Sequence, residues 1–411
     1  MPSVYRPLAV ALLTSLGLLA ARGPAAALDV NEDLVRRYAP ELHLCTYGTD
    51  GSGEGKDWTR PADIDWYLNT GAQVNGQTVG AAMRFNQDNC PDDGIASAGQ
   101  LNRSNVGSTQ WKDQKKGFLC VKSGDYYHAN QKSPSPDETK AYFFLQPRVG
   151  SGDGVDYDKV HHGIYGGANG ANPTLFATDG AGESITSLLN KGIDPQAAPP
   201  VGKWVMYVYV LTPSRFGGAA DIQYWFFYAY NDAAASVNHE SDWERVTVTV
   251  NDQGQVISLF LAEHEQGTQF VPDDTSRCSG GFISKLTMRQ NGTSARVCLD
   301  FTNEDSGMHP IVYSADGTHA TYPSGCATQC TWNGYAGGIT SDYTTAAGPA
   351  WKGWLTSSSA KNYEIVSDNT SWILYANLWG EVGATNTTSG KYSPKYQDWG
   401  KHNDDNPYGP K

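Results

Sequence analysis

The chain has 411 residues and a formal net charge of −13, with 30 lysines and arginines against 43 acidic residues. This negative balance argues against nucleic acid as a partner and is compatible with cation binding. Glycine (45), tyrosine (23) and tryptophan (12) are abundant and methionine (5) is scarce, which favours strands and loops over a helical bundle.

Residues 1–27 have the pattern of a secretory signal peptide. Arg6 precedes an apolar run over residues 8–21, and small residues lead to Ala27, where cleavage is expected. No later stretch reaches about 18 consecutive apolar residues, so no transmembrane segment is predicted. We therefore expect an exported protein that is secreted or held in a lumen of the secretory pathway.

Seven cysteines follow the signal segment, and export predicts that they form disulfides. Cys278 and Cys298 are spaced to staple a hairpin, and Cys326 and Cys330 to close a tight loop. The odd number leaves at least one cysteine free or in an intermolecular bond. Four sequons are candidate glycosylation sites in a eukaryotic host: Asn102, Asn291, Asn369 and Asn386.

The first part of the mature chain is polar and rich in turns. Acidic residues at the start and arginines at the end predict a short helix over residues 29–38. A strand is expected over 41–47, and a second short helix, with proline at its first position, over 61–68. Few further elements can be placed before residue 200.

From residue 203 the chain becomes a succession of short strands separated by turn signals. This density predicts a mostly β fold, an antiparallel β-sandwich or jelly roll with a few short helices and long loops. We expect one large domain over 28–411, with irregular elaborations over about 28–200 and about 326–411. The expected strands are 203–212, 222–230, 243–250, 256–262, 282–288, 295–299, 311–313, 363–366 and 372–378.

The most informative stretch is 221–250, where two apolar runs flank a polar segment. The second run alternates as a half-buried strand does, and its valines share one face with Asp242 and Glu244. Two inward-facing carboxylates repel each other and are costly to desolvate, so they require water, a basic partner or a cation. A solvated hairpin end with Arg245 or a lysine as partner is one interpretation. The other is a site for Ca²⁺, Mg²⁺ or Mn²⁺, which prefer oxygen ligands, and its candidate ligands are Asn231, Asp232, His239, Asp242 and Glu244.

Further residues are candidates to line the same site. Glu263 and His264 end a predicted strand, although a solvated strand end is the favoured explanation for them. His309 and His319 flank a tight turn, and His319 is the better placed of the two to point into a site, although a solvated or core histidine is the favoured explanation for both. His128, in strand material expected over residues 125–128, is the remaining candidate. No G-x-S-x-G, P-loop or HExxH motif occurs, so the sequence favours binding over catalysis.

Four pieces in this order resemble the vacuolar protein sorting-associated protein 62 family of fungi and plants. They are YAPELHL with Trp66-Tyr67-Leu68 after it, YWFFYAYN, HESDWERVTV and HPIVYSADGTHATYP, and they span residues 38–323. The combination is specific, whereas each piece alone is weak. The family name implies a link to vacuolar protein delivery, and hence a vacuolar lumen as a second expected location, without implying a reaction.

The stretch His239-Glu-Ser-Asp242-Trp243-Glu244 also resembles the signature of the necrosis- and ethylene-inducing-like secreted cytolysins. In that family the first His, the Asp and the Glu hold a divalent cation with an upstream Asp, whose position falls on Asn231 here. Ser241 replaces the second His of the signature. The resemblance implies a β-sandwich with a cation site at one mouth.

Three functions follow as hypotheses. The first is a secreted or vacuolar-lumen β-sandwich protein that binds a divalent cation, and the cation orders a mouth that recognises a glycan or a lipid head group. The second is a necrosis-inducing-like cytolytic effector that acts on target membranes. The third is a carbohydrate-active hydrolase or lyase that uses the same carboxylates.

Overall fold

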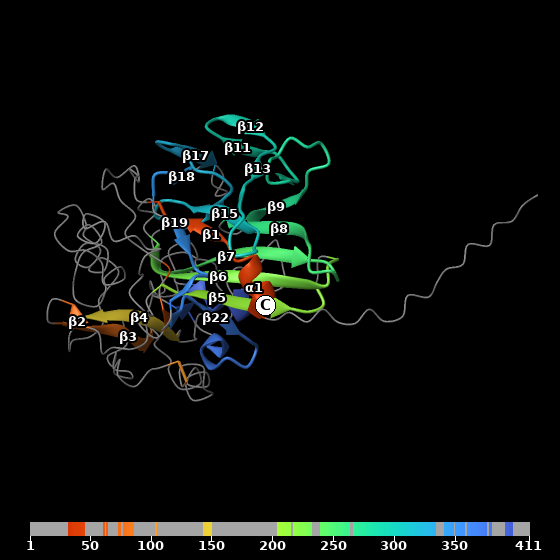
Figure 1. The fold of residues 1–411 in the computed structure, drawn as a ribbon. Coiled ribbons are helices and arrows are strands. Elements are labelled where there is room, and N and C mark those ends of the chain that lie inside the picture. Colours follow the sequence, from red (N-terminus) through yellow and green to blue (C-terminus); the bar gives the residue numbers. More distant parts are fainter. Residues whose placement is uncertain are drawn as a thin grey trace, which may run out of the picture.

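The computed structural model in Figure 1 is mostly β, with several antiparallel sheets and few helices, as predicted. It places the only described α-helix, α1 (Glu32–Arg37), inside the range expected for it. The structure describes residues 32–45, 61, 63–64, 73–74, 77–85, 103–104, 143–149, 204–214, 217–231, 239–263, 266–333, 341–348, 350–357, 360–375, 378–379 and 391–397. Within them, no helix is long and apolar enough to cross a membrane.

An eight-stranded sheet forms the centre of the fold, and its strands β5 to β8 appear in yellow-green to green in the middle of Figure 1. Its strands from β5 to β10 follow one another as an antiparallel meander, and β22 joins the β5 edge in parallel. In spatial order the strands are β13 (Cys298–Leu299), β10 (Phe282–Ser284), β9 (Gln266–Pro272), β8 (Val256–Glu263), β7 (His239–Val250), β6 (Ala220–Asn231), β5 (Met206–Leu211) and β22 (Tyr363–Val366).

A second sheet lies against the valine face of β7 and gives a sandwich-like arrangement. Its central strand β1 pairs in parallel with β15 and antiparallel with β19. One apolar core joins the two sheets and includes Leu42, Phe226, Val246, Leu261, Val312 and Trp351. The strands of this sheet are β14 (Phe301–Thr302), β15 (His309–Ser314), β1 (Glu41–His43), β19 (Ala350–Lys352) and β16 (Thr321–Tyr322).

Three further sheets and two 3₁₀ helices complete the described elements. The first sheet comprises β12 (Thr293–Ala295), β11 (Met288–Gln290), β17 (Cys330–Asn333) and β18 (Ser341–Thr344). The second comprises β2 (Gln73–Val74), β3 (Gln77–Phe85), β4 (Phe143–Val149), β23 (Leu378–Trp379) and β24 (Lys391–Tyr392). The others are β20 (Thr356–Ser357) with β21 (Ala360–Lys361), and the helices η5 (Ser371–Leu374) and η7 (Pro394–Gln397).

Several expected elements differ in the structure. The strand expected at 282–288 is divided between β10 and β11, and the one at 295–299 between β12 and β13, because the chain leaves one sheet for another. The strand expected at 372–378 is wrong: this segment begins as η5 and reaches β23 only at Leu378. Most of the helix expected over 61–68 falls outside the described residues.

The prediction that β7 is half-buried is also wrong, because both of its faces are covered. Residues 241–250 are all buried, including the polar face that carries Arg245, Thr247 and Thr249. On that face the Thr249 hydroxyl donates to Asp221 at 2.8 Å. Trp372 of η5 stacks on Trp243 with ring centroids 5.6 Å apart. A C-terminal segment that includes η5 thus packs on the face of β7 that carries Arg245, Thr247 and Thr249.

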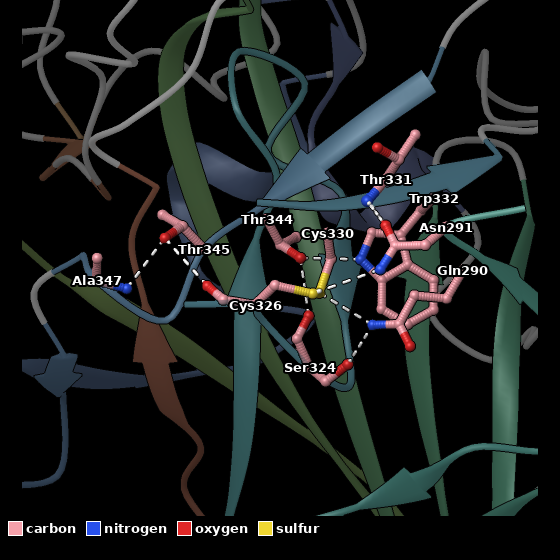
Figure 2. Close-up of a disulfide and its surroundings, with 10 residues drawn as sticks. All are labelled: Gln290, Asn291, Ser324, Cys326, Cys330, Thr331, Trp332, Thr344, Thr345 and Ala347. Atoms are coloured by element: carbon pink, nitrogen blue, oxygen red, sulfur yellow. Dashed lines mark hydrogen bonds between the residues drawn. A yellow bond between two sulfur atoms is a disulfide. The ribbon is translucent and has the colours of Figure 1, made fainter. Parts of the chain in front are cut away.

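The two predicted local disulfides are confirmed, Cys278 with Cys298 and Cys326 with Cys330. Figure 2 shows the second bond, at the first residue of β17 (Cys330–Asn333), within a hydrogen-bonded network. In it the Gln290 amide donates to the Ser324 hydroxyl at 2.8 Å, and the Asn291 side-chain oxygen accepts from the Thr331 N–H at 2.8 Å. Asn291, one of the predicted glycosylation sites, is therefore exposed but already engaged.

Replacing both cysteines of the Cys278–Cys298 pair with serine is expected to lower the free energy of unfolding by about 3 kcal/mol, because this bond closes a long loop of the unfolded chain. The same change at Cys326 and Cys330, which are four residues apart, is expected to cost about 2 kcal/mol. Urea unfolding of both double variants checks this order. A larger loss at the short loop would contradict loop closure as the main contribution.

Candidate functional site

β7 separates from β8 at the end where the acidic residues lie. Described pairing between the two strands begins at Val246, opposite Leu261. The start of β16 fills the space that follows: the Thr321 hydroxyl donates to the carbonyl of Ala262 at 2.8 Å and lies 3.4 Å from that of Arg245. Carbonyls left unused by strand pairing are thereby satisfied. The turn between β15 and β16 is thus brought to the acidic face of β7.

This turn places His319 against Asp242. The His319 Nδ1 lies 3.2 Å from Asp242 Oδ2, and Asp242 Oδ1 accepts a hydrogen bond from the backbone N–H of Trp243 at 2.9 Å. The His319 ring stacks on Tyr228 with centroids 3.9 Å apart and planes 4° apart. Tyr228 is the register partner of Asp242 on β6, so these side chains share one face of the sheet.

Two residues at this contact have a left-handed backbone. Ser241 has φ 57° and His319 has φ 58°, and both are fully buried. Such conformations in residues other than glycine cost about 1–3 kcal/mol each and cluster at functional sites. The Ser241 hydroxyl also accepts from the backbone N–H of Lys391 at 3.1 Å, which ties β24 to β7. The pair of Asp242 and His319 is therefore positioned by strained backbone on both sides.

Glu244, two residues further along β7, is a buried carboxylate. It is 4% exposed and makes no hydrogen bond or ion pair with any residue that the structure describes. Burial raises the pKa of Glu244 well above its usual value, and the negative charges of Asp242 and Asp342 raise it further. Lys391 and Arg245 offset only part of this effect. Without a cation, Glu244 thus retains its proton at a pH where an ordinary glutamate is charged.

The third carboxylate, Asp342 on β18, is fixed by two hydroxyl donors. Thr318 Oγ1 donates to it at 2.8 Å and the Tyr322 hydroxyl at 2.5 Å. Burial raises the pKa of Tyr322 well above its usual value, and the negative charges of Asp342, Glu263 and Glu244 add to the rise. Carboxylates on three strands, β7, β8 and β18, therefore contribute to the raised pKa of Tyr322.

The structure corrects one interpretation of Asp242 and Glu244. They do not lie at a solvated hairpin end, since each is 4% exposed and β7 begins three residues before Asp242. Arg245 is not their direct partner, because its guanidinium lies over the Trp225 ring, 4.9 Å from the centroid, on the opposite face. The carboxylates are thus desolvated, which is the condition under which a proton or a cation is most strongly required.

The structure describes only some of the remaining predicted site residues. Asn231 is 6% exposed and is the register partner of His239, so the two backbones meet at the far end of the β6–β7 pair. Glu263 ends β8, and its charge acts on Tyr322. Three candidates, and the side chain of a fourth, lie outside the described residues: Asp232, His264, His128 and the side chain of His239.

The sequence did not single out Asp342, Thr318, Tyr322 or Lys391. The one available signal is the pattern of β18, in which Asp342 and Thr344 alternate with more exposed residues and so place an acid on an inward face. Lys391 offers no comparable signal, because a single lysine in a polar tail has no periodic context.

The ligand set expected for a cation is not complete in the described part of the chain. No group of three or more His, Cys, Asp or Glu side chains there is arranged to hold a metal ion. Asp242 and Glu244 supply oxygen atoms, and the expected fourth and fifth ligands, Asp232 and the His239 side chain, are not among the described atoms. The donor set otherwise has the character that a hard divalent cation prefers.

Comparison with known proteins reveals no neighbour from which a function can be transferred. No family model, no curated protein and no solved structure matches the chain. The two family resemblances therefore stay hypotheses that rest on the motifs quoted above. The function must be inferred from the residues of the site.

Proposed function

We propose that this chain is an exported β-sandwich protein that binds a divalent cation at Asp242 and Glu244. The observation that carries the proposal is the environment of Glu244: a buried carboxylate, without a hydrogen-bond donor in the described residues, beside the negative charges of Asp242 and Asp342. A buried charge of this kind is stable only when it is neutralised. A cation would neutralise Glu244 and Asp242 together.

Ca²⁺, Mg²⁺ and Mn²⁺ are the ions that suit this site, because carboxylate and amide oxygens are their preferred ligands. Asn231, Asp232 and His239 are the further ligands in the proposal, and the Asn231–His239 register pair lies three residues along β7 from Asp242. His319 acts as a positioning residue, since it contacts Asp242 Oδ2 and is itself held by stacking on Tyr228.

In this proposal the bound ion also holds a glycan or a lipid head group. Polar ligands of this kind present hydroxyl or phosphate oxygens, which can complete the coordination of a hard cation. The proposal predicts ligand binding that disappears when the cation is chelated. The cytolytic and hydrolytic alternatives stay as predictions of the sequence: the first requires cation-dependent dye release from vesicles, and the second requires product from a polysaccharide.

Equilibrium dialysis with Ca²⁺, Mg²⁺ and Mn²⁺ tests the cation directly. The wild-type protein is expected to take up one ion per chain at submillimolar concentration, and Asp242→Asn is expected to lose at least tenfold in affinity, about 1.4 kcal/mol. Asp252→Asn, an exposed change in the turn after β7, is the matched control and should bind as the wild type does. Absence of uptake by the wild type at millimolar concentration would refute the proposal.

A further inference from the structure

A second site is formed where α1 meets the segment that leads into β15. The backbone N–H of Met308 donates to the Arg37 carbonyl at 2.9 Å, and the Nδ1 of His309 donates to the Ala39 carbonyl at 2.8 Å. The His309 ring stacks on Trp354, with centroids 3.7 Å apart and planes 7° apart. A pocket of about 210 Å³ lies here, lined by residues of α1, by the turn before β15, and by His309 and Trp354. The pocket therefore has a fixed frame.

Charges of both signs line this pocket without pairing with one another. Asp33, Arg36 and Arg37 come from α1, and Asp305 comes from the turn. None of these four side chains forms a hydrogen bond or an ion pair with another described residue. Opposite charges that line one pocket and remain unpaired are available to a ligand that carries both signs.

Two buried N–H donors of the pocket also lack an acceptor among the described residues. They are the indole Nε1–H of Trp354, whose side chain is 1% exposed, and the Nε–H of Arg36. A buried donor left without a partner costs about 1–3 kcal/mol. Both atoms belong to residues that line the same pocket as the guanidinium group of Arg37. A pocket lined by two arginines suits an oxyanion.

The turn from Glu304 to Gly307 holds the acidic rim in place. Asp305 and Ser306 have φ values of 46° and 63°, and the Gly307 N–H donates to the Glu304 carbonyl at 2.6 Å. Two successive left-handed residues without glycine are costly and occur at ligand clamps. At Gly307 a Cβ atom would lie 2.7 Å from the Arg37 carbonyl and 2.4 Å from His309 Nε2, so only glycine allows this close approach to α1.

We propose that this pocket binds a small zwitterion that carries an oxyanion and an ammonium group. The oxyanion pairs with the guanidinium groups of Arg36 and Arg37, and the ammonium group pairs with the carboxylates of Asp33 and Asp305. The pocket volume of about 210 Å³ is large enough for a group the size of phosphoethanolamine. The shared chemistry can come from a free solute or from a lipid head group.

Isothermal titration calorimetry with O-phosphoethanolamine tests the proposal on the full mature chain. Phosphoethanolamine is expected to bind at least tenfold more tightly than inorganic phosphate or ethanolamine alone, because each of these offers only one of the two charges. Arg37→Gln and Asp305→Asn are each expected to weaken binding at least tenfold. Arg289→Gln and Asp252→Asn, exposed changes outside the pocket, are the matched controls and should leave binding unchanged.

Arg37 and Asp305 are exposed, so both variants should fold, and an unchanged melting temperature checks this. Co-sedimentation with phosphatidylethanolamine vesicles then separates the two sources: vesicle binding that Arg37→Gln abolishes assigns a lipid head group, and binding of the free probe alone assigns a solute. The proposal is overturned if neither form binds at millimolar concentration, or if phosphate alone binds as tightly as phosphoethanolamine. It does not depend on the cation site, because the two sites share no residue.

Discussion

Glu244→Gln is expected to make the cation-free protein more stable at neutral pH and to abolish its stabilisation by divalent cations. Glutamine keeps the shape of the side chain but removes a negative charge that is buried beside Asp242 and Asp342. In the wild type, a saturating cation at a hundred times its dissociation constant is expected to add about 2.7 kcal/mol. Thermal melts in EDTA and in each cation measure both effects.

The pH dependence of wild-type stability is a second, independent test of the buried charge on Glu244. Because the pKa of Glu244 is raised in the folded state, its proton stabilises the fold fully below the ordinary value of 4.5, and this contribution is lost as the pH rises through the folded-state value. Cation-free stability is therefore expected to fall with rising pH, whereas Glu244→Gln should lack this fall. Stabilisation by a cation should grow over the same range, because the ion replaces the proton.

Asp221→Asn is the control for removing a buried carboxylate. Asp221 lies on β6, fully buried like Glu244, but it accepts hydrogen bonds from Ser214 Oγ at 2.7 Å and from Thr249 Oγ1 at 2.8 Å. Loss of its charge is expected to destabilise the protein by about 1–3 kcal/mol, opposite in sign to Glu244→Gln. Equal destabilisation by the two substitutions would show that Glu244 is satisfied as an anion without a cation.

The alternation of β7 predicted which residues share a face, but it did not predict what covers each face. Asp242, Glu244 and the valines lie together as expected, because the period of two is a property of the strand itself. Arg245, Thr247 and Thr249 indicated a solvated face, yet this face is buried. The covering residues are more than a hundred positions later in the chain, and no local pattern reports such a distant contact.

The same limit applies to the candidate site. His319 could be singled out by the turn before it, and the structure brings it to within 3.2 Å of Asp242. Asp342, which raises the pKa of Glu244, lies a hundred residues from β7 in a strand that was not predicted. Its role depends on the packing of β18 against the second sheet, so only the tertiary structure shows that three carboxylates gather.

Trp243→Ala is expected to destabilise the protein by about 3–5 kcal/mol, the range for removing a large buried aromatic side chain. Trp243 is 4% exposed and lies at the centre of an aromatic cluster. Its ring stacks on Trp372 at 5.6 Å and contacts Phe227 at 4.7 Å and Trp379 at 5.9 Å. The backbone N–H that binds Asp242 is retained in alanine, so the loss reports packing and not the candidate site.

A double-mutant cycle measures how much the contact between Trp243 and Trp372 contributes to the packing of η5 on the central sheet. The planes of Trp243 and Trp372 are 6° apart, and direct aromatic pairs of this kind contribute about 0.5–1.5 kcal/mol beyond their buried area. Trp243→Ala and Trp372→Ala are therefore expected to be non-additive by that amount in urea unfolding. Trp243→Phe, which keeps one ring, should lose less than alanine. Strict additivity would mean that the Trp243–Trp372 contact contributes nothing to stability beyond the burial of each ring. Other contacts would then hold η5 against the polar face of β7.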